Sequence, residues 1–272
     1  MNFNQKLDKA IDKNNSLVCV GLDPDLAKIP QHLHAEKHPL FTFNKAIIDS
    51  THDLVCTYKP NSAFYEAAGA TGIEQLKMTC DYINEAYPEI PILLDFKRGD
   101  IGNTNNSYCA FAFEYLNADA CTVQPYSGIE ALAPFLAYKD KGIFVLCKTS
   151  NPGSNEFQNL MIDGKLLHVF LAEQIRDSWN KNENVMLVVG ATYPEELGKL
   201  RKDMGDMVFL VPGVGSQGGS VEDILQAGLT SEKRGLIINS SRGILYASSG
   251  EDFTEKAREE ALSMRDSINK FR

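Results

Sequence analysis

Four ionisable side chains cluster just after an apolar run about a third of the way along the chain. The run spans residues 90–94, and Asp95, Lys97, Arg98 and Asp100 follow it. Side chains two residues apart point to the same face of a strand, so we expect Asp95 and Lys97 to lie side by side. Carboxylates and cations held at a strand end shift each other's pKa values and can move a proton. A structural salt bridge is the alternative, because such pairs also perturb pKa values.

Polar side chains end several other apolar runs. Asp23 follows the first run and Lys59 ends the second. The C-terminal ends of parallel strands meet at one edge, so both residues are expected beside the charged group of residues 95–100. This arrangement predicts a ring of alternating charges around one site.

Neutral hydrogen-bonding groups follow the fourth and fifth runs. They are Gln124, Thr149, Ser150 and Asn151. Amide and hydroxyl groups of this kind suit a planar polar ring as ligand. A role as helix N-cap is the alternative for Ser150 and Asn151.

Residues 213–218 read Gly-Val-Gly-Ser-Gln-Gly, a formal match to the dinucleotide-binding pattern G-x-G-x-x-G. That pattern belongs after the first strand of its fold, with an acidic residue about 20 positions later, whereas here it follows the seventh run. Loops after strands seven and eight of a barrel frequently bind phosphate. Gly215, Gln217 and Arg242 are therefore candidate phosphate ligands, and a solvated arginine at a turn is the alternative for Arg242.

Eight β-rich segments must position these groups. Each segment is mostly apolar on both faces, which is typical of parallel strands covered by helices. They span residues 17–22, 54–59, 90–97, 118–124, 142–148, 185–191, 207–214 and 236–239. The alternation with helices predicts an α/β fold, a closed (β/α)₈ barrel of the TIM type, with the site at the C-terminal strand ends. An open doubly wound sheet is the alternative.

Segments with helical periodicity lie before, between and after these strands. They span residues 4–14, 42–52, 72–87, 105–116, 128–138, 166–180, 194–202, 220–227 and 251–271. The clearest, 105–116, places one apolar stripe along the helix, made of Tyr108, Phe111, Ala112, Tyr115 and Leu116. Two loops, 24–41 and 151–165, exceed the usual short connection, and the second is a candidate lid.

Composition favours one globular domain, residues 1–272. Apolar residues make up 43% and charged residues 23% of the chain, enough for a large core. A net charge of -9 argues against binding to nucleic acid or to anionic membranes. No apolar stretch approaches the roughly 18 residues of a membrane span, and residues 1–14 lack the apolar centre of a signal peptide, so we expect a cytoplasmic protein.

Cysteine and histidine do not form a recognisable site in the sequence. The six cysteines include no Cys-x-x-Cys pair, and we expect reduced, buried thiols. His32, His34 and His38 fall in one long polar loop without a third ligand from a strand, so no metal site is predicted. The sequence also lacks a nucleophile elbow and a Walker loop.

The pattern Asp95-x-Lys97-x-x-Asp100-Ile101-x-x-Thr104 resembles the signature of the orotidine 5′-phosphate decarboxylase family. Other strand-end motifs agree with it in order: Gly21-Leu22-Asp23-Pro24, Lys59-Pro60-Asn61, Thr149-Ser150-Asn151-Pro152, Pro212-Gly213-Val214-Gly215 with Gln217, and Asn239 with Arg242-Gly243. Arg98-Gly99 and the chain length resemble the longer bacterial branch, type 2. The resemblance implies a cofactor-free carboxy-lyase that forms UMP from orotidine monophosphate in pyrimidine biosynthesis.

The resemblance also implies roles for particular residues. A charged tetrad would contain Lys59, Asp95, Lys97 and Asp100. In a homodimer, Asp100 and Thr104 would reach the site of the partner.

The substrate contacts are implied in the same way. Asp23 would hold the ribose, and Lys59 would contact a ribose hydroxyl. Ser150 would bind the pyrimidine edge, and Gln217 with Arg242 would bind the phosphate.

Two other functions stay open at this point. Related barrels act on sugar phosphates as Mg²⁺-dependent decarboxylases or aldolases and share an Asp-x-Lys-x-x-Asp core. They need an acidic metal ligand after the second strand, where this chain has Lys59. A non-catalytic barrel that binds a nucleotide is the second alternative, and the intact Asp95, Lys97 and Asp100 argue against it.

Overall fold

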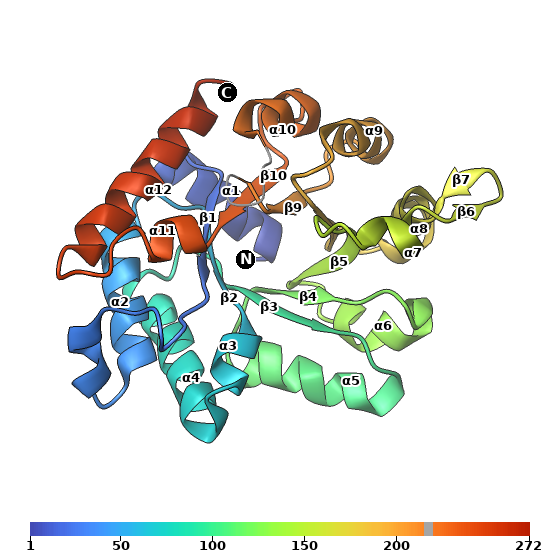
Figure 1. Cartoon of the computed structure of the whole chain (residues 1–272). Helices are drawn as coiled ribbons and strands as arrows, with labels where there is room; N and C mark the ends of the chain where they lie inside the picture. The colour runs from blue at the N-terminus through green and yellow to red at the C-terminus, as the bar shows by residue number, and fades with distance from the viewer. Residues whose placement is uncertain (215–219) are drawn as a thin grey trace.

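The chain folds into a barrel of eight parallel strands, shown by the computed structural model in Figure 1. The structure describes residues 1–214 and 220–272. The barrel strands are β1 Val18–Leu22, β2 Thr57–Pro60, β3 Leu93–Arg98, β4 Ala120–Val123, β5 Gly142–Lys148, β8 Val185–Val189, β9 Phe209–Pro212 and β10 Leu236–Ser240. Hydrogen-bonded neighbours follow the order β2-β1-β10-β9-β8-β5-β4-β3.

Two isolated parallel bridges close this ring. Tyr58 pairs with Ile92 and Asn61 pairs with Asp95, which joins β2 to β3. The predicted (β/α)₈ barrel is therefore confirmed, and the alternative of an open doubly wound sheet is wrong. Closure places the C-terminal ends of all eight strands around one mouth.

Burial explains why these segments form strands. Every residue of β1, β2, β4, β5 and β8 is buried. Apolar side chains on one face fill the barrel interior, and those on the other face pack against helices. The strands therefore carry apolar residues without the alternation of a half-exposed sheet.

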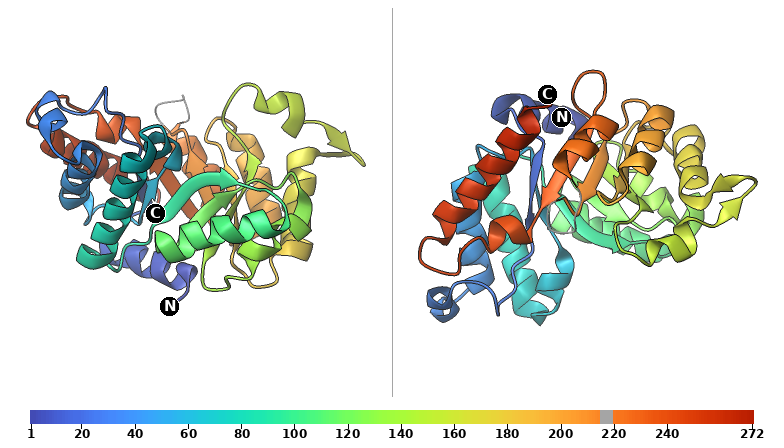
Figure 2. Two further views of the ribbon diagram at one scale, coloured as in Figure 1. Left: turned by 90° about the horizontal axis from the view of Figure 1, so that it is seen from below. Right: turned by 45° about the horizontal axis from the view of Figure 1, so that its top comes forward.

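Helices surround the barrel on all sides in the views of Figures 1 and 2. They are α1 Phe3–Asn14, α2 Pro39–Thr51, α3 Ser62–Glu66, α4 Gly69–Ala86, α5 Gly102–Cys109, α6 Gly128–Leu136, α7 Ser154–Gln158, α8 Leu167–Gln174, α9 Pro194–Met204, α10 Val221–Gly228, α11 Arg242–Leu245 and α12 Phe253–Asn269. α1 packs on the barrel through Phe3, whose ring lies edge-on to Phe144 of β5 at 5.6 Å. None of the helices described is long and apolar enough to span a membrane.

The helix α5 continues beyond Cys109, and this continuation departs from the helical periodicity predicted for residues 105–116. Residues Ala110–Tyr115 form a π-helical segment, and the backbone N–H of Leu116 donates to the carbonyl of Phe111 at 3.0 Å. The extra residue in this turn rotates the later side chains by about 100° relative to an α-helix. Phe113 is buried in consequence, whereas Tyr115 is 45% exposed, so its predicted place in the apolar stripe is wrong.

The two long connections contain short elements that periodicity could not detect. Residues 24–41 hold a 3₁₀ turn, Gln31–Ala35, and the start of α2. Residues 151–165 hold α7 and most of a small hairpin, β6 Met161–Ile162 with β7 Lys165–Leu166. The hairpin projects from the barrel beside α7 and α8 (Figure 1). All six cysteines are buried free thiols.

Candidate active site

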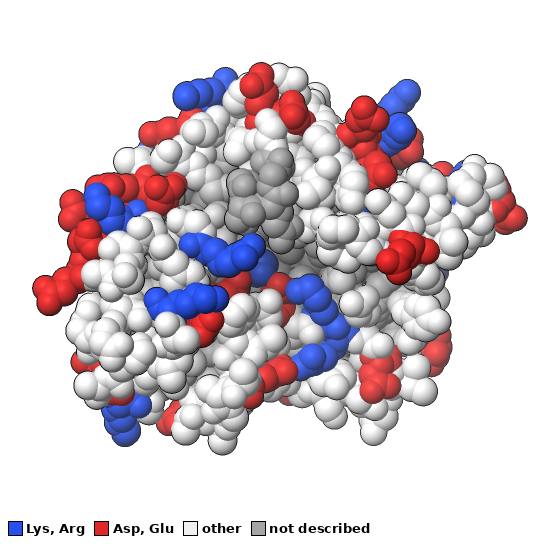
Figure 3. Space-filling model, viewed as in Figure 1, with Lys and Arg blue, Asp and Glu red and all other residues white. Residues whose placement is uncertain are grey.

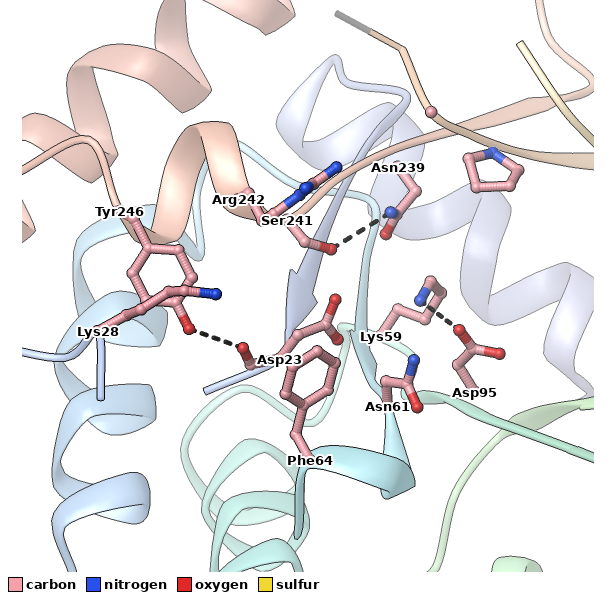
Figure 4. A pocket seen from close by; sticks show the side chains of 12 residues that line it. Asp23, Lys28, Lys59, Asn61, Phe64, Asp95, Asn239, Ser241, Arg242 and Tyr246 are labelled. Atoms are coloured by element: carbon pink, nitrogen blue, oxygen red, sulfur yellow. Dashed lines mark hydrogen bonds and ion pairs between the residues drawn. The ribbon is translucent and has the colours of Figure 1, made fainter. Parts of the chain in front are cut away.

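Asp95, the third residue of β3, is the centre of the charged site. Its side chain is only 8% exposed and contacts two cations. Lys59 Nζ of β2 lies 2.8 Å from Asp95 Oδ2, and Lys97 Nζ lies 2.6 Å from Asp95 Oδ1. The expected proximity of Asp95, Lys97 and Lys59 is confirmed, and Figure 4 shows the Lys59 contact.

Thr122 of β4 completes the support of Asp95. Its hydroxyl donates to Asp95 Oδ1 at 2.8 Å and accepts the backbone N–H groups of Phe96 and Lys97 at 3.1 and 3.0 Å. Thr122 is not among the site residues predicted from the sequence. The available signal is a single hydroxyl within the otherwise apolar strand Ala120–Val123, where a buried polar group needs partners.

The backbone at Lys97 is strained. Its φ angle is +46°, in the left-handed region that residues with a side chain rarely occupy. The pairing of β3 with β4 also shifts register between Leu94 and Arg98. Such a conformation costs about 1–3 kcal/mol and persists only where the surroundings enforce it. The two bonds from the backbone to Thr122 provide this enforcement, so an irregular strand, rather than regular alternation, brings Lys97 back to Asp95.

The ion pairs fix the protonation states of this group. Burial alone would raise the pKa of Asp95, but Lys59 and Lys97 outweigh it and hold this pKa far below its ordinary value of 3.8. Burial would lower the pKa of Lys59, yet Asp95 and Asp23 raise it above its ordinary value of 10.5. One carboxylate therefore stays ionised between two ammonium groups across the neutral pH range.

A cavity of about 260 Å³ opens beside these charges at the mouth of the barrel. It is lined by Asp23, Lys28, Lys59, Asn61, Phe64, Asp95, Pro212, Gly213, Asn239, Ser241, Arg242 and Tyr246 (Figure 4). The expected gathering of Asp23, Lys59 and Arg242 with Asp95 is confirmed. Lys28, Phe64 and Tyr246 were not anticipated, because they come from a loop and from short helices or their ends rather than from strand ends. Ser241 directly follows β10 and was not selected as a ligand.

Asp23 directs a polar atom toward this cavity. Its Oδ1 is buried and has no hydrogen-bond partner among the described residues. The backbone around it is fixed by two tyrosines. Tyr246 OH donates to the Asp23 carbonyl at 2.9 Å, and Tyr65 OH donates to the Leu22 carbonyl at 2.9 Å. A buried acceptor held in this way is arranged for a donor that a ligand would supply.

Arg242 supplies a cation on the opposite side of the cavity. It is the first residue of α11, is exposed, and forms no ion pair within the described parts of the chain. Basic side chains border the hollow at the centre of the face in Figure 3. Its expected neighbours, Gly215 and Gln217, lie outside the described residues.

Asp100 and Thr104 do not join the charged group of their own chain. Both are exposed, and Asp100 Oδ1 accepts the backbone N–H of Ile101 at 2.7 Å. Asn105 holds the backbone of this turn, because its side chain donates to the Asp100 carbonyl and accepts the Asp100 N–H at 3.1 Å. One chain therefore assembles three of the four expected charges.

Ser150 is half-buried two residues after the end of β5, but it does not line the cavity. Its backbone packs so closely on Gly190 that a Cβ there would lie 2.6 Å from the Ser150 nitrogen. The alternative role of Ser150 and Asn151 as helix N-caps is wrong, because Gly153 occupies that position of α7.

Comparisons with known proteins agree on one family. Residues 16–257 match the model of the "Orotidine 5'-phosphate decarboxylase / HUMPS family". The chain is 52% identical to an orotidine 5'-phosphate decarboxylase of Cellvibrio japonicus, over 99% of this chain and 98% of that protein. It is 49% identical to the enzyme of that name from Ralstonia pickettii, over the full length of both. The solved structure of Leishmania donovani OMP decarboxylase superposes with a TM-score of 0.87 at 38% identity, covering 100% of this chain and 99% of that one.

The buried charges predict a pH-dependent loss of stability in an Asp95→Asn variant. At pH 7 we expect the free energy of unfolding to fall by about 3–5 kcal/mol, since Lys59 loses its buried partner. The depressed pKa of Asp95 means that its stabilisation is complete above the unfolded pKa of about 4 and is lost as pH falls through the folded pKa. The difference between wild type and variant should therefore narrow below about pH 4 in urea titrations.

Asp53→Asn is the matched control, because Asp53 forms an exposed ion pair with Arg258. It should change the unfolding free energy by less than about 1 kcal/mol. Equal stability of wild type and Asp95→Asn at pH 7 would contradict the assigned role of the buried pair.

Proposed function

Because the chain belongs to the orotidine 5′-phosphate decarboxylase / HUMPS family, we propose that it decarboxylates orotidine 5′-phosphate to UMP and CO₂ in pyrimidine biosynthesis. The main structural support for this reaction is the set of contacts among Lys59, Asp95 and Lys97. This group lies beside a cavity that is also lined by Asp23 and Arg242. The identity of about half to named decarboxylases over the whole chain supports the same reaction. The whole chain, residues 1–272, acts as one barrel domain, and the expected location is the cytoplasm.

Lys97 carries the chemical step. The bond between C6 of the pyrimidine and the carboxylate carbon breaks, CO₂ leaves, and the electron pair stays on C6 in an orbital outside the ring π system. No resonance sink exists there, so a fixed cation must stabilise the charge. The Lys97 ammonium does this and then transfers a proton from Nζ to C6 as general acid.

Asp95 and Lys59 hold Lys97 ready for this step. Asp95 fixes the ammonium through the 2.6 Å contact, and Lys59 keeps Asp95 ionised from the other side. A site organised before the substrate arrives does not have to reorganise during the reaction. Lys59 and Asp23 also bind ribose hydroxyls, for which Asp23 Oδ1 is a suitable acceptor, since it has no hydrogen-bond partner among the described residues.

Binding of the remote phosphate supplies further catalytic energy. Arg242 offers a planar guanidinium that can bind a phosphate with two hydrogen bonds. Gly215 and Gln217 are the further ligands in this proposal, and Ser150 binds the pyrimidine edge. Binding energy at the phosphate orders the site around C6 and excludes water.

The active unit is a homodimer. Asp100 and Thr104 are exposed, beside Ile101, an isoleucine that is 62% exposed. In the dimer Asp100 completes the tetrad of the partner site and Thr104 contacts the partner's substrate. This arrangement accounts for an acidic residue of the signature that makes no contact with Lys97 of its own chain.

A Mg²⁺-dependent reaction on a sugar phosphate is the alternative, because the family also includes the HUMPS branch. A metal beside Asp95 would lie close to Lys59 Nζ, which contacts Asp95 Oδ2 at 2.8 Å. An ammonium there repels a divalent cation. A barrel that binds a nucleotide without catalysis would not need Lys97 in a strained backbone conformation.

The first test is turnover of orotidine 5′-phosphate, followed by the loss of its ultraviolet absorbance. We expect turnover that EDTA leaves unchanged and that Lys97→Ala lowers by about 10⁴-fold or more, since stabilising and protonating the carbanion are both lost. Lys202→Ala, an exposed lysine of α9, is the control. Absence of turnover by folded protein, with activity on a sugar phosphate and Mg²⁺ instead, would favour the alternative.

Arg242→Ala tests the remote phosphate site. We expect kcat/KM to fall at least about a hundredfold, which corresponds to about 3 kcal/mol, although the residue does not contact C6. Arg234→Ala is matched to it, because Arg234 pairs with Asp8 and Asp12 near the N-terminal end of the same strand, β10. Equal kinetics of the two variants would remove Arg242 from the site.

Mixing two inactive variants tests the shared site. Lys97→Ala and Asp100→Ala should each be inactive alone. A mixed dimer contains one site with an intact Lys97 and the partner's Asp100, so random re-association should restore about a quarter of wild-type activity. Activity that does not rise on mixing, in samples where mixed dimers are detected by mass, would contradict the contribution of Asp100 across the interface.

A further inference from the structure

Lys148, the last residue of β5, is a fully buried cation outside the charged site. Its side chain is 0% exposed. Nζ donates to Asn155 Oδ1 and to Asn159 Oδ1, both at 2.9 Å. The nearest carboxylate oxygen, Glu196 Oε2 of α9, is 3.7 Å away, and the ring centroid of Tyr193 lies at 4.7 Å.

The two amide oxygens both belong to the connection that follows β5. Asn155 is part of α7 and Asn159 is its C-cap residue. An ammonium removed from water is costly unless hydrogen bonds and charge compensate it. Glu196 is close but does not reach hydrogen-bond distance, and its Oε2 has no hydrogen-bond partner among the described residues. The amides of α7 therefore supply both hydrogen bonds that Lys148 makes there.

α7 itself buries little apolar surface. Its one buried residue is Ser154, and Phe157 is 51% exposed. Polar bonds hold it instead, because Gln158 also accepts the Thr149 N–H at 2.8 Å and donates to the Thr149 hydroxyl at 2.9 Å. A short helix with few apolar contacts depends on such bonds for its position.

Ser150 lies between the end of β5 and the start of α7. The Lys148 carbonyl accepts the Gly190 N–H at 2.8 Å, and Ser150 packs against Gly190 two residues later. Thr192 Oγ1 also donates to the Ser150 carbonyl at 3.2 Å. The segment 149–153 therefore joins these fixed points to α7, and the position of α7 fixes its other end.

We propose that Lys148 is a positioning residue: by binding Asn155 and Asn159 it holds α7 against β5 and α9, and so places Ser150 at the pyrimidine edge of the substrate. This inference deepens the proposed function and rests on it for the identity of the substrate. Lys148 contacts neither the cavity nor the charged group around Asp95.

Two variants remove the contact from its two sides. Lys148→Met replaces the ammonium by an apolar chain of similar length. Asn155→Ala with Asn159→Ala removes the amides and keeps the lysine, and it alters one exposed and one half-buried side chain, so the core of the barrel is left unchanged. Glu156→Ala is the matched control on the same helix, because the exposed Glu156 side chain makes no hydrogen bond or ion pair within the described residues.

Amide hydrogen exchange across residues 149–160, measured by mass spectrometry without substrate, tests the positioning itself. We expect exchange at least about tenfold faster in Lys148→Met and in the double variant, and unchanged in Glu156→Ala. The rest of the barrel should exchange as in wild type. Unchanged exchange in the folded double variant would overturn the proposal, even if Lys148→Met failed to fold.

Kinetics then test the consequence for the substrate. kcat/KM for orotidine 5′-phosphate should fall at least about tenfold in both variants, or about 1.4 kcal/mol. The inhibition constant of inorganic phosphate, which binds at the Arg242 side, should stay within about twofold, since a local change at Ser150 does not reach it. If the affinity for inorganic phosphate fell by the same factor as kcat/KM, the variants would have damaged the whole site, and the positioning role would be overturned. Absence of turnover by wild type would refute the proposed function, whereas the exchange measurement would still decide whether Lys148 holds α7.

Discussion

One buried carboxylate between two ammonium groups is the interaction on which the rest of the site depends. Asp95 stays ionised there at neutral pH, and neither lysine can move away without leaving charge uncompensated. The apolar strands exclude water from below these charges. Thr122 fixes the orientation of the Asp95 carboxylate and of the backbone next to it. The strained backbone conformation of Lys97 persists only because these surrounding contacts enforce it. The barrel, Thr122 and the irregularity in β3 thus all help to hold Asp95 between Lys59 and Lys97.

Much of this site could be predicted from the order of residues. Strand ends in a barrel converge, so Asp23, Lys59 and Asp95 could be placed together from strand positions alone. Thr122 was missed, although it carries the one hydroxyl of β4, because the sequence does not show which group that hydroxyl contacts. Tyr246 was missed for a different reason: it follows the short α11, and no pattern says that its hydroxyl returns to the loop after β1.

The fold was predictable to a similar depth. Apolar runs and helical periodicity located all eight barrel strands and the long helices, since burial on two faces or on one face leaves a clear pattern. The five-residue helices α3 and α7 are too short to show a period. The π-helical turn before Leu116 changes the period itself, so the burial of Phe113 could not follow from regular spacing. Errors therefore lie where local geometry departs from regularity.

The junction of β2 with β3 has a further consequence. Strand pairing there consists of two bridges, one of which contains Asp95, and the ion pair between Lys59 and Asp95 spans the same junction. The seam of the barrel therefore runs through its charge array. A fluctuation that parted these two strands would also draw the lysine from the carboxylate. Conversely, a ligand that strengthened the ion pair between Lys59 and Asp95 would also stabilise the pairing of β2 with β3. Closure of the barrel and the arrangement of charge at its site are therefore coupled in this protein.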